Sequence, residues 1–212
     1  MLQLASLPLL AALLVGAPAP GPVPPADTVK AARWRIDVTH SELRFRIRHL
    51  VSRVTGTFTD WEGTIVADPT DLAGGSVSVT IRTKSIDTNH ERRDAHLRSA
   101  DFFHADSAPT ITFRSTRVEQ EGERIRVVGE LTIRGTTRPV VLEGRYLGVA
   151  KGPGGRDRIG FEASTRLNRL DYGVSWNRAA EGGGVVLGDE VDVDIVVAAV
   201  REDPEAAAAG GR

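Results

Sequence analysis

The chain has 212 residues and no cysteine, and its 27 basic and 28 acidic side chains give a formal net charge of -1. The missing cysteines exclude disulfides and thiol chemistry, and the charge balance gives no general attraction to nucleic acid or to an anionic membrane. The length favours one domain with room for tails.

Residues 4–15 form an almost unbroken apolar run, shorter than the roughly 20 residues that a membrane-spanning helix needs. The small residues Gly16, Ala17 and Ala19 follow, as at the cleavage zone of a secretory signal peptide. An apolar helix docked on the domain is the alternative. Five prolines in the same region predict an extended linker. We therefore expect residues 1–26 to be signal peptide and linker, and the mature protein to be periplasmic or secreted without a transmembrane span.

Residues 34–37 and 43–48 predict the first two strands. In the second strand, Leu43, Phe45 and Ile47 alternate with three arginines, which is the period of a half-buried strand. Because arginine side chains need water, we expect the three apolar side chains to face the interior.

Residues 54–58 and 63–67 predict a hairpin that turns at residues 60–62. Residues 68–71 and the pair Gly74-Gly75 are typical turn material. The remaining strands are expected at residues 77–82, 111–113, 125–133, 140–149, 159–167 and 191–197.

Residues 90–99 predict the one helix of the domain, with Asn89 as its cap. Leu97 is its only large aliphatic residue, so the helix should lie on the surface and cover something. Phe102 and Phe103 follow it and should plug the apolar interior.

Eight to nine short strands and one helix favour an antiparallel meander closed into a barrel. About eight strands leave an interior for side chains or for one slender ligand. A transmembrane barrel carries its apolar residues outside, whereas here the row of arginines in residues 43–48 must face water. We predict an all-β fold, an antiparallel β-barrel of about eight strands with one short lid helix.

The expected lumen residues share inward parity on their strands. They are Leu43, Phe45, Ile47, Val79, Ile81, Ile111, Phe113, Leu131, Ile133, Phe161 and Leu167. A packed core without a cavity is the alternative. Most of these residues are β-branched or leucine, and only three are phenylalanine, which favours a channel.

A second set is expected to surround the mouth and hold a ligand head group, namely Arg93, Asp94, His96, Leu97, Phe102, Phe103 and Tyr172. Asp94 and His96 also allow an enzyme, an isomerase or hydrolase acting on a lipid. The commoner use of such a cluster is an ion pair that fixes a lid helix. A structural protein linked to stress, which binds nothing tightly, is a third hypothesis.

Other chemistry has little support in the spacing of the polar residues. His90 and His96 are six apart and point to different faces of a helix, and no metal-binding His-x-His or His-Glu-x-x-His spacing occurs. Ser41 and Ser85 lack the surroundings of a nucleophile and should satisfy backbone groups at strand ends. We expect no metal, no catalytic residue and no cofactor other than a bound lipid.

Several motifs in one order resemble the YceI-like family. They are Trp34-x-Ile-Asp-x-x-His40-Ser41, Phe45-x-Ile-x-His49-Leu, Gly56-x-Phe58, Ser85-Ile-Asp-Thr88, Arg93-Asp-x-His-Leu-Arg-Ser99, Asp101-Phe-Phe103, Pro109-x-Ile-Thr-Phe-x-Ser-Thr116, Gly129-x-Leu-Thr-Ile-x-Gly135, Asn168-Arg169 and Tyr172-Gly-Val174. The match covers about residues 33–200. It implies a lipocalin-like barrel that binds a polyisoprenoid, a quinone-type or another long-chain lipid, usually outside the cytoplasm.

Together these observations predict an exported, soluble carrier. Residues 27–200 would form a YceI-like lipid-binding barrel, and residues 201–212 a disordered tail. The expected partner is an apolar lipid, a polyisoprenoid or isoprenoid quinone, and not nucleic acid. A homodimer is compatible with the sequence.

Overall fold

The computed structural model describes residues 31–181 and 183–202. The predicted signal peptide and linker, and the tail beyond residue 202, lie outside them. The strands are β1 (Ala32–Ile36), β2 (Glu42–His49), β3 (Ser52–Phe58), β4 (Trp61–Asp68), β5 (Asp71–Arg82), β6 (Ile86–Asp87), β7 (Thr110–Glu121), β8 (Arg124–Ile133), β9 (Thr136–Lys151), β10 (Asp157–Asn168) and β11 (Leu187–Arg201). The helices are α1 (Glu91–Arg98) and the 3-10 turns η1 (Val38–His40), η2 (Thr83–Ser85), η3 (Pro153–Gly155) and η4 (Arg169–Tyr172).

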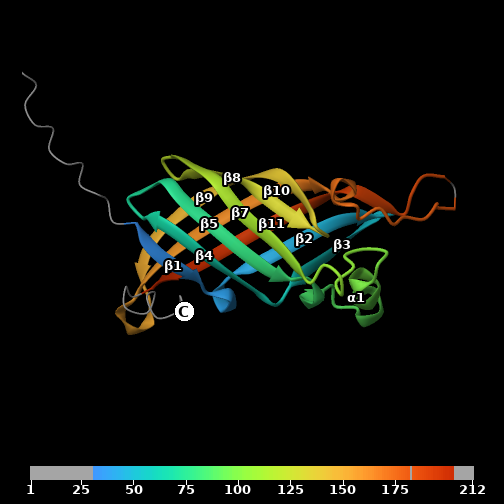
Figure 1. Cartoon of the computed structure of the whole chain (residues 1–212), viewed down its shortest axis with the longest axis horizontal. Coiled ribbons are helices and arrows are strands. Elements are labelled where there is room, and N and C mark those ends of the chain that lie inside the picture. The colour runs from blue at the N-terminus through green and yellow to red at the C-terminus, as the bar shows by residue number, and fades with distance from the viewer. Residues whose placement is uncertain (1–30, 182, 203–212) are drawn as a thin grey trace, which may run out of the picture.

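Eight strands close into an antiparallel barrel in the order β1, β4, β5, β7, β8, β9, β10 and β11, and β11 pairs back to β1 (Figure 1). The sheet continues from β11 through β2 and β3 to the short β6. The predicted all-β barrel of about eight strands with one short helix is therefore confirmed. No helix within the described ranges is long and apolar enough to cross a membrane.

Strand β10 occupies one edge of β11. The other edge of β11 pairs with two strands in succession. Its last residues pair with β1, and its first part pairs with β2. The strand is interrupted between β1 and β2, and we call this interruption the break. There the Ser41 hydroxyl donates to the Asp37 carbonyl at 2.8 Å and accepts from the Ala198 N–H at 2.9 Å. Ser41 thus satisfies backbone groups at a strand end, as predicted, and so does Ser85, which donates to the Arg82 carbonyl.

The predicted hairpin of residues 54–67 is wrong. Strand β3 pairs with β2 and β6, and β4 pairs with β1 and β5, but β3 and β4 do not pair with each other. Thr59 and Asp60 interrupt one long strand instead of reversing it. The sequence predicts Trp61 in the turn, but its side chain is buried on the inner face of β4, and this burial keeps the segment extended. Gly74-Gly75 also lies inside a strand, β5, and not in a turn.

Helix α1 lies at the barrel end that also carries the turn between β2 and β3 (Figure 1). Its cap is His90, whose ring accepts a bond from a first-turn N–H, whereas Asn89 has a left-handed φ of 58°. Arg98 donates to the carbonyls of Lys84 and Ile86, both at 2.8 Å. The helix is therefore tied to η2, which follows β5, and to β6 by bonds to the backbone.

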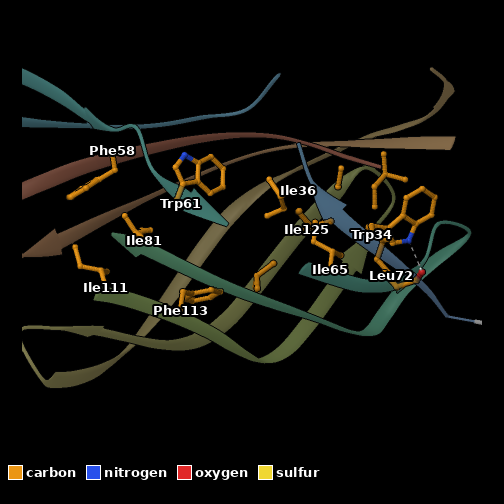
Figure 2. Close-up of a cluster of buried hydrophobic side chains, with 14 of the residues drawn as sticks. Trp34, Ile36, Phe58, Trp61, Ile65, Leu72, Ile81, Ile111, Phe113 and Ile125 are labelled. Atoms are coloured by element: carbon orange, nitrogen blue, oxygen red, sulfur yellow. Dashed lines mark hydrogen bonds between the residues drawn. The ribbon is translucent and has the colours of Figure 1, made fainter. Parts of the chain in front are cut away.

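The opposite end of the barrel, where β1 closes the ring, is a packed core. Figure 2 shows Trp34 beside Leu72 and Ile65, away from Phe58. Trp34 is 1% exposed, and its indole N–H donates to the Ala67 carbonyl at 3.2 Å. We call this end the closed end.

The sheet reaches into the segment predicted to be a tail. Arg201 belongs to β11, and the N–H of Glu202 donates to the Arg33 carbonyl at 2.9 Å. The prediction that the tail begins at residue 201 is therefore wrong by these two residues, because β1 offers them a free edge.

Asp37 lies at the break between β1 and β2 and joins it to β10. Its carboxylate accepts bonds from the Thr39 hydroxyl at 2.6 Å, from Arg158 at 2.7 Å and from the His40 ring at 2.9 Å. The bond from Thr39, with those from Arg158 and His40, holds the pKa of the Asp37 carboxyl well below its usual range. A carboxyl with a lowered folded-state pKa stabilises the fold above its unfolded pKa of about 3.9, and this stabilisation is lost as the pH falls through the folded value.

We predict that Asp37→Asn lowers the free energy of unfolding at neutral pH, and that the difference from wild type shrinks as the pH falls from about 4 toward 2. Urea unfolding of both proteins across this range measures it. The control is Asp60→Asn, because the Asp60 carboxylate accepts no hydrogen bond from the described residues. A difference that stays constant with pH would show that the charge of Asp37 is not what stabilises the break.

Candidate functional site

The barrel encloses a cavity of about 400 Å³ that runs from near the closed end to the end covered by α1. Its lining includes all of the predicted lumen residues, Leu43, Phe45, Ile47, Val79, Ile81, Ile111, Phe113, Leu131, Ile133, Phe161 and Leu167. The alternation of apolar and polar residues therefore placed these side chains correctly. The interior combines a packed core with a cavity, because buried side chains from Trp34 to Phe113 pack against one another around the open space.

Two glycines explain why aromatic residues on the inner face leave space. Gly56 lies opposite Phe45 in the β2–β3 ladder, and a Cβ built on Gly56 would collide with the Phe45 ring. A Cβ on Gly129 would lie 2.5 Å from the Phe113 ring. Each ring therefore occupies the space that a side chain on the neighbouring strand's glycine would fill. A small side chain, Ala163 of β10, also lines the cavity and leaves further space.

His96 of α1 lines the cavity at its mouth between two aromatic rings. Its ring stands edge-on to Phe102 and to Trp176, each with centroids 5.0 Å away. Its Nε2 lies 2.8 Å from an oxygen of Asp101, a residue that follows the helix. The imidazole is thus held in one orientation by two rings and one carboxylate.

Arg93 and Asp94 lie in the first turn of α1 but face different surroundings. Arg93 lines the cavity, donates twice to Thr88, at 2.7 Å each, and has no carboxylate within ion-pair distance among the described residues. Asp94 is 5% exposed and does not line the cavity. It accepts bonds from the N–H and the hydroxyl of Thr88, at 3.0 and 2.5 Å. Asp94 therefore braces the helix against the strand end, and its predicted place at the mouth is not what the structure shows.

The enzyme hypothesis required Asp94 and His96 to act together. The structure does not bring them together, because Asp94 bonds to Thr88 and His96 bonds to Asp101. The predicted ion pair within this cluster is also absent from the described residues, since Arg93 bonds to Thr88 and not to Asp94. No three His, Asp or Glu side chains of the described ranges are grouped to hold a metal.

The other predicted mouth residues form one apolar cluster under the helix. Phe102 and Tyr172 are buried in it, and Leu97 and Phe103 pack against it, all four lining the cavity. Both phenylalanines therefore close the interior, as expected. Burial raises the pKa of the Tyr172 phenol, so this hydroxyl stays protonated at neutral pH.

Arg169 organises the segment before β11 and was not predicted as a site residue. It is 6% exposed, and it donates to the carbonyls of Gly188, Val174 and Trp176 and to the Asp189 carboxylate. Burial lowers the pKa of its guanidinium. The bonds from Arg169 hold the irregular segment in place. Because Arg169 also lines the cavity, this segment lies at the mouth.

Trp61 and Trp176 line the cavity as well and were also missed. Trp176 lies in a segment without periodicity, where only contacts distant in sequence decide which way a ring points. The sequence contains a signal for Trp61, because an apolar residue between Asp60 and Glu62 fits the alternation of a half-buried strand as well as it fits a turn.

A family model described as a YceI-like domain matches residues 34–199 of this chain. The curated relative "Protein YceI" of Shigella flexneri is 39% identical over 180 residues, which cover 84% of this chain and 91% of that protein.

Solved structures share the fold. The YCEI protein of Campylobacter jejuni matches with a TM-score of 0.63 and 32% identity, over 74% of this chain and 91% of that one. A polyisoprenoid binding domain from Saccharophagus degradans matches with a TM-score of 0.60, over 82% of this chain and all of that domain. Its identity of 18% makes this second likeness one of fold alone.

We predict that Gly56→Ala reduces the cavity, because the added methyl group forces the Phe45 ring into the lumen. Overpacking of this kind costs about 1–3 kcal/mol of stability. Binding of a fluorescent apolar probe, anilinonaphthalene sulfonate, should fall several-fold. The control is Thr55→Ala on the exposed face of the same strand, and equal probe binding by both variants would contradict the proposed seat of the Phe45 ring.

Proposed function

The chain belongs to the YceI-like family, and we propose that it holds a long-chain apolar ligand, a polyisoprenoid or an isoprenoid quinone, in its barrel lumen. One observation carries the proposal: a cavity of about 400 Å³ whose lining is almost wholly apolar, with its charged side chains, Arg93 and Arg169, at the mouth. Ligand sites in proteins have volumes of about 300–1,000 Å³, so the cavity is of the right order. The printed name of the Saccharophagus degradans domain, which records polyisoprenoid binding, supports the class of ligand.

The lumen would bind by burial of apolar surface. Each square ångström removed from water contributes about 25 cal/mol, from which the cost of association is subtracted. Wall contacts of this kind do not depend on hydrogen bonds, so the lumen should accept apolar chains of similar width. Selection among head groups would then fall to the polar residues of the mouth, chiefly Arg93 and His96.

The proposal is of a binding protein that carries out no turnover. It includes export to the periplasm or the outside of the cell, which rests on the apolar run at residues 4–15 and on the small residues after it. N-terminal sequencing of protein from the periplasmic fraction tests this part separately from ligand binding.

The lumen is tested by a pair of substitutions on β10. Ala163 lines the cavity, whereas its neighbour Ser164 is exposed on the outer face. We predict that Ala163→Phe lowers the affinity for a fluorescent polyisoprenoid at least tenfold, because the ring occupies the space of the ligand. Ser164→Phe adds the same ring outside and should leave the affinity unchanged.

Native mass spectrometry of both variants, before and after solvent extraction, shows whether a co-purified lipid is lost together with the affinity. The proposed function is wrong if wild type binds no polyisoprenoid after extraction, or if the two variants bind it equally well.

The mouth is tested by neighbouring arginines on α1. Arg93 lines the cavity and has no carboxylate partner in the part of the chain that the structure describes, whereas Arg92 is exposed. A hydrogen bond from a charged donor is worth about 1.5–3 kcal/mol, so Arg93→Gln should weaken binding of an isoprenoid quinone at least tenfold. It should leave binding of squalene, which has no head group, unchanged.

Arg92→Gln should change neither affinity. Because Arg93 also bonds to Thr88, a loosened helix is the competing explanation. A loosened helix would weaken squalene and quinone alike, and that result would contradict a role for Arg93 in holding the head group.

A further inference from the structure

The turn between β2 and β3 exposes two apolar side chains. Val51 is 104% exposed and Leu50 is 45% exposed relative to a reference side chain. The Leu50 N–H donates to the Val186 carbonyl at 2.8 Å, which brings Val185, 44% exposed, to the same place. We call Leu50, Val51 and Val185 the apolar tip.

The requirements of the fold do not explain the residues of this turn. His49 pairs with Ser52, so the turn has two residues, Leu50 and Val51. Asn, Asp and Gly dominate such turns, because they adopt a left-handed backbone without strain. Leu50 has φ 52° and therefore carries that strain. An exposed leucine held at a strained position points to a use outside the fold.

The charges beside the apolar tip are unbalanced, although the whole chain has a net charge of -1. Arg48 and Arg178 are exposed, and neither has a carboxylate within ion-pair distance among residues 31–181 and 183–202. Arg48 instead donates to the Leu50 carbonyl at 3.3 Å, which holds its guanidinium at the tip. Glu181 is the acidic residue of this segment. The tip is thus apolar with an excess of positive charge.

The tip lies at the mouth of the cavity. His49 and Leu187, which pair with each other next to the tip, both line the cavity. Figure 1 shows the β2–β3 turn and the segment before β11 projecting from the barrel end that carries α1. Whatever binds the tip therefore lies beside the opening.

We propose that the apolar tip docks on an anionic phospholipid bilayer and places the mouth of the barrel on the membrane. Leu50, Val51 and Val185 would enter the boundary between head groups and acyl chains, while Arg48 and Arg178 attract the lipid phosphates. Three small apolar side chains and two arginines give weak, reversible binding. The purpose of docking, exchange of the apolar ligand with the membrane, rests on the proposed function, but the docking itself does not.

The test is co-sedimentation of the purified protein with vesicles of phosphatidylglycerol and phosphatidylcholine. The variant Leu50→Gly/Val51→Ser installs a common two-residue turn sequence, so it removes the apolar side chains while relieving the strain at residue 50. It should keep the thermal midpoint of wild type and lose at least tenfold in vesicle affinity. Wild type should also bind vesicles of phosphatidylcholine alone more weakly.

The matched control is Leu147→Ser, because Leu147 is 55% exposed on strand β9 of the barrel wall. It should bind vesicles as wild type does. The proposal is overturned if wild type does not bind the anionic vesicles, or if the tip variant binds them as well as wild type does. It is also overturned if analytical ultracentrifugation shows that wild type is a dimer and the tip variant a monomer, while both bind vesicles equally well.

Uptake of a fluorescent polyisoprenoid in solution, without vesicles, separates this proposal from the proposed function. The tip variant should take up the probe normally but exchange it with vesicles at least tenfold more slowly. If wild type binds vesicles and takes up no probe, the proposed function fails and the docking surface stands.

Discussion

Strand β11 is hydrogen-bonded along one edge to both β1 and β2, and both ends of the barrel depend on this shared edge. The break between β1 and β2 is matched by breaks at Thr59–Asp60 and at η2 in the next strands. On one side of these breaks the ring closes around Trp34. On the other side β6 has no pairing to β7, and α1 covers the gap. The same interruption thus seals one end and opens the other.

The cavity depends on glycine as much as on apolar residues. Phe45 and Phe113 supply apolar surface, but each ring is folded onto a glycine of a neighbouring strand, Gly56 or Gly129. A side chain at either glycine would push the ring into the lumen. The mouth is built differently, since the buried Arg169 lies there and donates hydrogen bonds to backbone carbonyls. The wall is therefore adapted to a chain with few polar groups, and the charged lining residues gather at one end.

The strands and the lumen could be predicted because their signal is local. Along residues 43–48 the arginine side chains need water and the apolar side chains need burial, so the alternation fixes which face of the strand points inward. The same rule identified the other lumen residues. The misses were decided elsewhere. Trp61 lies between two acidic residues, which favours a turn, but its pairing with Ile81 of β5 places it in a strand. The partner of Asp94 is Thr88, and the clamp of Arg169 reaches Asp189, and neither contact has a sequence pattern.

The shared edge of β11 also governs how the chain must fold. Trp34 pairs with Arg201, so closure joins residues from the beginning and the end of the domain. Contacts between residues so distant in sequence slow folding, because the loop must close before the contacts stabilise it. Until residues 187–201 have left the ribosome, β10 has an unpaired edge and β1 and β2 lack their common partner. The barrel therefore cannot close before β11 has been synthesised, so the last long strand of the domain decides when the wall is complete.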